Sequence, residues 1–60
     1  MFSEILFYQN HREYFSQVFK GQYIVIKDEA LVGHFSTWAE ACYNALRIFK
    51  NDNFLIKYCS

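Results

Sequence analysis

Apolar side chains recur at helical spacing along the first third of the chain. Successive intervals of four, three, one and three residues place five of them on one helical face: Phe7, His11, Tyr14, Phe15 and Val18. Ser3 is suited to be the N-cap, and Glu4 lies in the first turn, where a carboxylate meets the helix dipole favourably. Lys20 and Gly21 form a stop signal. The pattern therefore predicts a helix over residues 3–20.

Two short segments rich in β-branched and aromatic residues come next and predict a hairpin. They are YIVIK (residues 23–27) and ALVGHF (residues 30–35), and Asp28 and Glu29 separate them. A tight type I′ turn needs positive φ at both central positions, which glutamate disfavours. A two-residue turn and a loop of three or four residues therefore both remain open, with registers that differ by one.

The alternation along these strands predicts a sheet with two different faces. A two-residue turn would pair Ile26 with Leu31 and Ile24 with Gly33. One face would then carry Ile24, Ile26, Leu31 and Phe35. The opposite face would carry Tyr23, Val25, Lys27, Val32 and His34.

A second helix begins at a capping box. Thr37 is the expected N-cap, and Glu40 follows three residues later, where its side chain can reach back. An apolar stripe then continues along the helix through Trp38, Ala41, Cys42, Ala45, Leu46 and Phe49. Residues 51–53 (NDN) have turn chemistry, and FLIKYC at 54–59 predicts a third strand.

The order of these elements restricts the topology. A right-handed crossover through the second helix makes the third strand parallel to the second, so the first strand lies between them. This predicts a sheet of order 2-1-3 in which both neighbouring pairs are antiparallel. We expect both helices on one face of the sheet, giving a two-layer α+β domain with the order α-β-β-α-β over residues 1–60.

The composition explains how so short a chain could hold a core. Only 60 residues are present, but 53% are hydrophobic and 22% are aromatic. Six basic and six acidic residues balance, which argues against a nucleic-acid footprint or a polybasic membrane signal. Without a cationic region before its first apolar run, the chain is expected to be cytoplasmic, with no signal peptide or membrane span.

Many of these residues match a pattern known from a family. That pattern has an N-terminal helix, a Tyr/Phe-x-Gly-x-Tyr-Val-x-Ile-x-Asp-Gly stretch, an apolar strand, a Glu-Ala-x-x-x-Ala-Leu helix and a terminal Phe-Leu-Ile strand. The matching residues here are Phe19, Gly21, Tyr23, Ile24, Ile26, Asp28, Gly33, Glu40, Ala41, Ala45, Leu46, Phe54, Leu55 and Ile56. Over residues 11–58 the chain thus resembles a family of short bacterial and archaeal proteins of unknown function. Glu29 departs from it, because the family has glycine there. The resemblance implies the fold and no activity.

Residues capable of catalysis or metal binding are few and scattered. His11, His34, Cys42 and Cys59 show no C-x-x-C or H-x-x-x-H spacing of the kind that zinc sites use. We expect Cys42 to be a buried thiol on the helix stripe and Cys59 to be a reactive thiol near the C-terminus. The sequence therefore predicts no enzyme activity, no metal and no cofactor.

An open sheet face would be the main functional feature of the two-layer arrangement. It would present Tyr23, Val25, Lys27, Val32, His34, Leu55 and Lys57 as a contact surface. The first hypothesis is a small interaction or adaptor module that forms a homodimer or binds a protein partner, with the contact on this face or along an exposed edge strand at residues 30–35 or 54–59. The alternative is single-stranded nucleic-acid binding, with bases stacked on Tyr23 and His34 and phosphates at Lys27 and Lys57. The zero net charge disfavours it.

Overall fold

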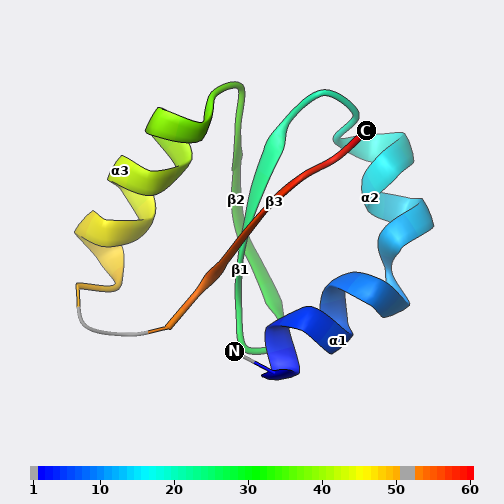
Figure 1. Ribbon diagram of the computed structural model, residues 1–60, viewed down its shortest axis with the longest axis horizontal. Coiled ribbons are helices and arrows are strands. Elements are labelled where there is room, and N and C mark those ends of the chain that lie inside the picture. The colour runs from blue at the N-terminus through cyan, green and yellow to red at the C-terminus, as the bar shows by residue number, and fades with distance from the viewer. Residues whose placement is uncertain (1, 51–52) are drawn as a thin grey trace.

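The computed structural model describes residues 2–50 and 53–60 and forms an α+β fold around a three-stranded sheet (Figure 1). Its elements are α1 (Phe2–Asn10), α2 (Arg12–Val18), β1 (Tyr23–Lys27), β2 (Ala30–Phe35), α3 (Trp38–Ile48) and β3 (Leu55–Tyr58). The sheet order is β2-β1-β3, and both pairings are antiparallel. The predicted fold class and strand order are confirmed. The predicted turn at 51–53 includes residues 51 and 52, which lie outside the described residues.

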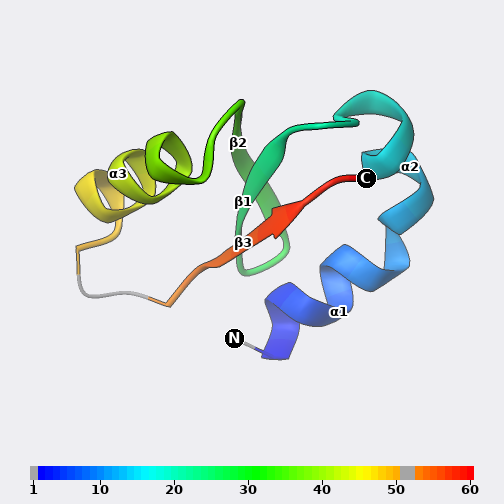
Figure 2. The same cartoon turned by 45° about the horizontal axis from the view of Figure 1, so that its top comes forward.

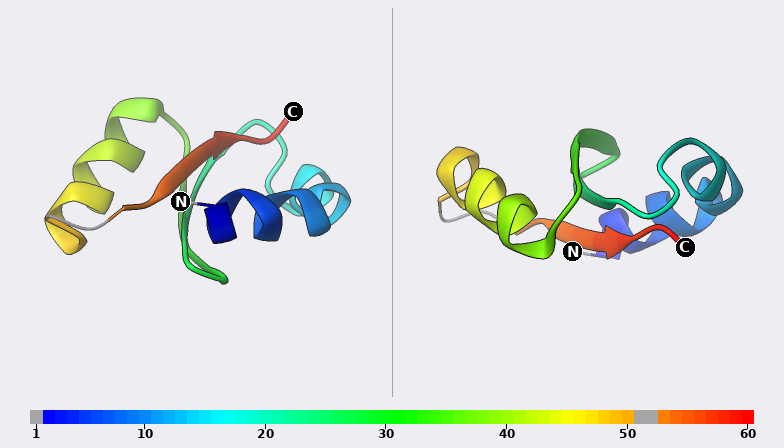
Figure 3. Two further views of the ribbon diagram at one scale, coloured as in Figure 1. Left: turned by 60° about the horizontal axis from the view of Figure 1, so that its bottom comes forward. Right: turned by 90° about the horizontal axis from the view of Figure 1, so that it is seen from above.

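Helices cover both faces of the sheet, so the predicted two-layer arrangement is wrong. Along the longest dimension of the molecule, α3 forms one layer, the strands the next, and α1 with α2 the third (Figures 1 and 2). The view from above separates the same three layers (Figure 3). Ile24 and Ile26 pack on the side of α1 and α2, with Phe15. Val25 packs on the other side against α3.

The physical reason lies in β1 itself. Its three central residues, Ile24, Val25 and Ile26, are all buried. A strand that alternates apolar and polar residues can leave one face in water, but a continuous apolar run is typical of a strand covered on both faces. Placing both helices on one face would have left the Val25 side chain exposed at the centre of the sheet.

The hairpin turn contains two residues, and a bulge follows it. Ile26 pairs with Leu31, but Val25 then pairs with Gly33, so Val32 is an extra residue in β2. The predicted pairing of Ile24 with Gly33 is therefore wrong, since Ile24 lies opposite His34. After the bulge, the β2 side chains point to the side opposite to the one expected.

Asp28 explains how this turn forms without a glycine. It has a φ of 58° and is the only non-glycine residue with positive φ among the described residues. Aspartate enters the left-handed region more readily than most residues. Glu29 does not adopt a positive φ, so the poor fit of glutamate to a left-handed position does not oppose this two-residue turn.

The turn is attached to the first helix by Glu4. The backbone N–H of Asp28 donates a hydrogen bond to Oε2 of Glu4 at 2.6 Å, and the Glu4 side chain is buried. Hydrogen bonds to this carboxylate, among them the one from the Asp28 N–H, lower the pKa of Glu4 from 4.5 to about 2. The carboxylate was expected only to meet the helix dipole; it joins two elements that are distant in sequence.

This carboxylate should make stability depend on acid pH. Because its pKa is lower in the folded protein than in the unfolded chain, its contribution is complete above pH 4.5 and is lost as the pH falls through about 2. We expect Glu4→Gln to remove this part of the pH dependence in urea unfolding measured over a pH series. Glu13→Gln, at an exposed glutamate of α2, should retain it. Identical profiles for Glu4→Gln and the unmodified protein would contradict this role.

The helix predicted over residues 3–20 is divided in two at His11. This residue has φ −119° and ψ 19°, its Nδ1 hydrogen-bonds the Phe7 carbonyl at 2.9 Å, and its ring lies 4.5 Å from the Phe7 ring. The chain turns here (Figure 1). The bend carries Phe15 into the core, while Tyr14 and Val18 from the predicted stripe are left exposed.

Both ends of this helical region differ slightly from expectation. Ser3 lies inside α1, where its hydroxyl donates to Glu4 at 3.4 Å, so it is not the N-cap. Helix α2 ends at Val18, two residues before Lys20. Gly21 has a φ of 81°, and its N–H donates to the carbonyl of Cys59 at 2.6 Å. The left-handed glycine therefore anchors the chain that follows β3.

The third helix begins as the capping box predicts. The Thr37 hydroxyl accepts a hydrogen bond from the Glu40 N–H at 3.1 Å. The Glu40 carboxylate accepts from the hydroxyls of Ser36 at 3.0 Å and Thr37 at 3.4 Å. The buried face of α3 consists of Ala41 and Ala45, which allow the helix backbone to approach Val25 closely.

Candidate interaction surface

The seven residues predicted to share an open face do not lie together. Toward α3 lie Tyr23 and Val25. Toward α1 and α2 lie His34, Leu55 and Lys57. Lys27 and Val32 lie near the hairpin turn and the bulge. The predicted common surface does not form, for two reasons. The bulge exchanges the faces of the β2 side chains that follow it. In addition, β3 pairs Leu55 with Ile26 and Lys57 with Ile24, and both isoleucines face α1 and α2.

The sheet also lacks the arrangement that base stacking would need. Tyr23 and His34 lie on opposite faces. The His34 ring lies 4.8 Å from the Phe19 ring, and its Nδ1 hydrogen-bonds Gln22 at 2.7 Å. Both faces are covered by helices, so the sheet cannot act as the predicted stacking platform.

A different apolar surface appears on α3. The predicted stripe of this helix is wider than the part that the sheet covers. Ala41 and Ala45 are buried, but Leu46 is more than half exposed and Trp38 is 54% exposed. Because Trp38, Cys42 and Leu46 are four residues apart, they follow one another along the helix. One side of the stripe therefore reaches solvent through Trp38 and Leu46, with the partly buried Cys42 between them.

Three aromatic rings connect this half of α3 to β3. The Tyr23 ring lies 6.0 Å from Trp38 in an edge-to-face arrangement and 5.0 Å from Tyr58. Tyr23 is partly buried, whereas Trp38 and Tyr58 are 54% and 50% exposed. These three residues form a continuous surface, called here the aromatic surface. Sequence reasoning missed it because it assigned Trp38 to the core.

The aromatic surface adjoins an edge of the sheet. The order β2-β1-β3 places β3 at one end, so one side of its backbone has no partner among the described strands. Open edges readily pair with another chain unless charges, bulges or proline protect them. The other edge, β2, contains the Val32 bulge. In β3 only Lys57 is charged, and its ammonium lies 5.1 Å from the centre of the Tyr8 ring, on the side away from Tyr58.

The two cysteines are free thiols with exposures opposite to those expected. Cys59 is buried in the core with Phe15 and Ile24, and this burial raises the pKa of its thiol. Cys42 is only partly buried. The third strand continues into pairing with Gln22, whose carbonyl accepts from the Cys59 N–H at 2.9 Å, and this draws the C-terminal segment inward.

We therefore expect Cys42 to react with a maleimide faster than Cys59 in the folded protein. A thiol that is both buried and hard to ionise has little thiolate at neutral pH. Labelling followed by mass spectrometry, with Cys42→Ser and Cys59→Ser to assign the sites, measures both rates. In denaturant the two rates should converge. Faster labelling of Cys59 without denaturant would contradict its placement in the core.

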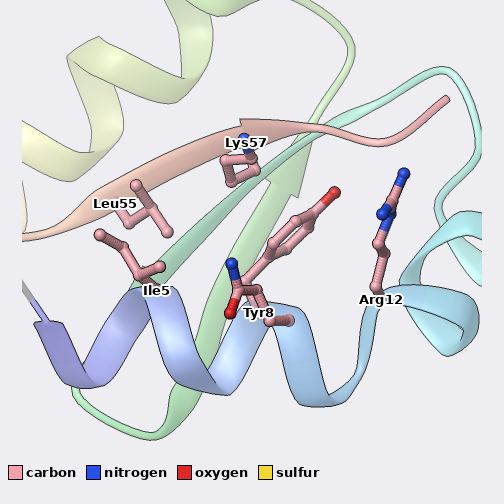
Figure 4. A pocket seen from close by; sticks show the side chains of 6 residues that line it. Ile5, Tyr8, Arg12, Leu55 and Lys57 are labelled. Carbon is pink, nitrogen blue, oxygen red and sulfur yellow. The ribbon is translucent and has the colours of Figure 1, made fainter.

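A second surface feature is a groove of about 490 Å³ between α1 and β3. Its six lining residues are Ile5, Tyr8, Gln9, Arg12, Leu55 and Lys57. Figure 4 shows side chains from the helical region and from the strand pointing into the space between them. The groove contains apolar and cationic side chains and no acidic one.

Within residues 2–50 and 53–60, no three His, Cys, Asp or Glu side chains lie together as metal ligands. None of the described helices is both long and apolar enough to cross a membrane.

No protein-family model, curated protein or solved structure matches this chain. The resemblance to the family of short proteins of unknown function therefore remains a prediction from the sequence.

Proposed function

We propose that this protein is a non-enzymatic interaction module, acting in the cytoplasm, that pairs with a second copy of itself through the β3 edge and the aromatic surface. The observation that carries the proposal is the exposure of Trp38 and Tyr58 beside an edge strand. Tryptophan and tyrosine contribute disproportionately to the free energy of protein binding. Their contacts with Tyr23 order the rings before binding, which reduces the entropy lost on association.

The β3 edge supports the proposal in a second way. Two β3 strands that pair antiparallel about a two-fold axis perpendicular to the sheet would join the two sheets into one. Such an axis keeps the same face of each sheet on the same side, so both aromatic surfaces would border the new contact. The bulge in β2 makes the opposite edge less suited to pairing.

The size of the molecule favours using both features together. A stable interface buries roughly 800 Å² on each partner, which is about a fifth of the 4178 Å² accessible surface. An edge of four residues is too small to supply this area alone. The aromatic surface adds the apolar area that the strand lacks. An extended segment of another protein could bind the same edge by adding a strand.

The experiment is light scattering coupled to size exclusion over a dilution series. We expect a dimer at high concentration that Tyr58→Ser and Trp38→Ser convert to monomer. Tyr43→Ser is the matched control, because Tyr43 is an exposed aromatic residue of α3 that contacts Arg47 and no residue of the aromatic surface. Circular dichroism must show that each variant remains folded.

Two results would overturn the proposal. One is a dimer that Tyr43→Ser weakens as much as Tyr58→Ser does. The other is a monomer at every concentration, together with equal retention of host proteins by immobilised unmodified protein and by Tyr58→Ser. Trp38 is the only tryptophan, so a blue shift of its emission on association gives an independent readout.

A further inference from the structure

The groove between α1 and β3 has the volume of a small-molecule site. Its volume of about 490 Å³ falls within the range of roughly 300–1,000 Å³ typical of ligand pockets. Ile5, Tyr8 and Arg12 approach it from the helical side at intervals of three and four residues, and β3 contributes Leu55 and Lys57. Both walls are built from elements of secondary structure.

The groove is apolar at one end and cationic at the other. Ile5 and Leu55 lie side by side at one end, and Arg12 lies at the opposite end (Figure 4). The Tyr8 ring lies between these ends, with its hydroxyl directed toward the Arg12 end. Lys57 lines the groove with its ammonium 5.1 Å from the centre of the Tyr8 ring.

The lining of this site contains cations and no acid. Among residues 2–50 and 53–60, Arg12 and Lys57 line the groove and no carboxylate does. The acidic residues next to the lining in sequence are not part of it: Glu4 is buried and accepts from the Asp28 N–H, and Glu13 is not among the lining residues. Two of the six cations therefore line one groove, although the chain as a whole has no net charge.

We propose that this groove binds a small amphiphile: one anionic headgroup, a carboxylate or a phosphate monoester, on a short apolar chain. The chain would lie against Ile5 and Leu55, and the Tyr8 hydroxyl, Arg12 and Lys57 would donate to the anion. Charge-assisted hydrogen bonds of this kind are the stronger ones in proteins, and a guanidinium fits either headgroup. The site lies on the face of β3 opposite to the aromatic surface, because Lys57 and Tyr58 point to opposite sides of the strand.

The test is an NMR titration of the full chain with octyl phosphate, inorganic phosphate and octanol, each below any concentration at which it aggregates. We expect octyl phosphate to shift the signals of Ile5, Tyr8 and Leu55 and to bind at least about tenfold more tightly than the other two probes. Arg12→Gln and Lys57→Gln should each weaken binding by about tenfold. Arg47→Gln is the matched control, because Arg47 is on α3, remote from the groove, and should leave affinity unchanged.

Several outcomes would overturn the proposal. Equal binding of octanol would show that the cations contribute nothing, and equal binding of inorganic phosphate would remove the apolar recognition. Loss of affinity in Arg47→Gln equal to that in Arg12→Gln would show general charge attraction. Absence of any shift in the folded protein would exclude the site. A second experiment uses vesicles that contain phosphatidate. If the protein sediments with these vesicles and Arg12→Gln abolishes the sedimentation, the natural ligand is a lipid headgroup. If the protein binds octyl phosphate but does not sediment with the vesicles, the natural ligand is a dissolved molecule.

Discussion

Val25→Asp is expected to unfold the protein, whereas Val32→Asp should leave it folded. Val25 is 1% exposed and packs in one cluster with Ala41 and Ala45 of α3, so an aspartate there would be a buried charge with no partner. Such a charge costs about 3–5 kcal/mol. This is comparable to the whole stability of a 60-residue domain, about 3–9 kcal/mol.

The Val32 variant is the matched control for this prediction. It makes the same change in the same sheet, but at the bulge of β2, where the side chain is 38% exposed and can reach water. Far-ultraviolet circular dichroism and amide NMR spectra distinguish the two outcomes. A folded Val25→Asp protein would mean that α3 does not cover this face of β1.

Ile26→Ala should have the second largest effect. Its side chain is fully buried in the cluster that contains Phe15, Ile24 and Cys59, on the side of α1 and α2. Truncation of a buried isoleucine removes apolar contacts and leaves a cavity, at a cost of about 2–5 kcal/mol.

Ile48→Ala provides the comparison. Ile48 is 57% exposed near the end of α3, and substitutions at such positions change stability by about 0.5 kcal/mol or less. Urea unfolding of both variants measures the difference. Similar losses of stability in the two variants would be incompatible with a core centred on β1.

The local features of this fold could be predicted from the sequence because they depend on short-range chemistry. The strand boundaries at 23–27 and 30–35, the Thr37 cap and the order 2-1-3 follow from residue type, spacing and the limits on crossovers. The division of the first helix at His11 was missed, since the apolar stripe runs through this residue without a glycine or proline.

Long-range features were predicted poorly, and for a common reason. The Val32 bulge changes the register by one residue, and such a shift exchanges the faces of every later side chain in β2. The hydrogen bond from the Asp28 N–H to Glu4 joins residues 24 positions apart and has no local signal. The coverage of both sheet faces did have a signal in the sequence, because three consecutive apolar residues in YIVIK, Ile24 to Ile26, give the strand no polar face.

The wrong prediction of the contact surface has the same cause. With both helices assigned to one face, Trp38 was placed in the core and Leu55 and Lys57 on an open face. The structure instead exposes Trp38 and Tyr58 on one side of β3 and directs Leu55 and Lys57 into the groove on the other. Only the relative placement of the layers determines which of these side chains can meet a partner.

That placement can be measured directly through nuclear Overhauser effects in a sample labelled at methyl and aromatic groups. The structure predicts contacts from the Val25 methyls to the methyls of Ala41 and Ala45, and from Ile24 and Ile26 to the ring of Phe15. Contacts between Phe15 and Ala45, combined with Val25 methyls that contact no residue of α3, would place all the helices on one side. That result would contradict the three layers, and with them both surfaces proposed for binding.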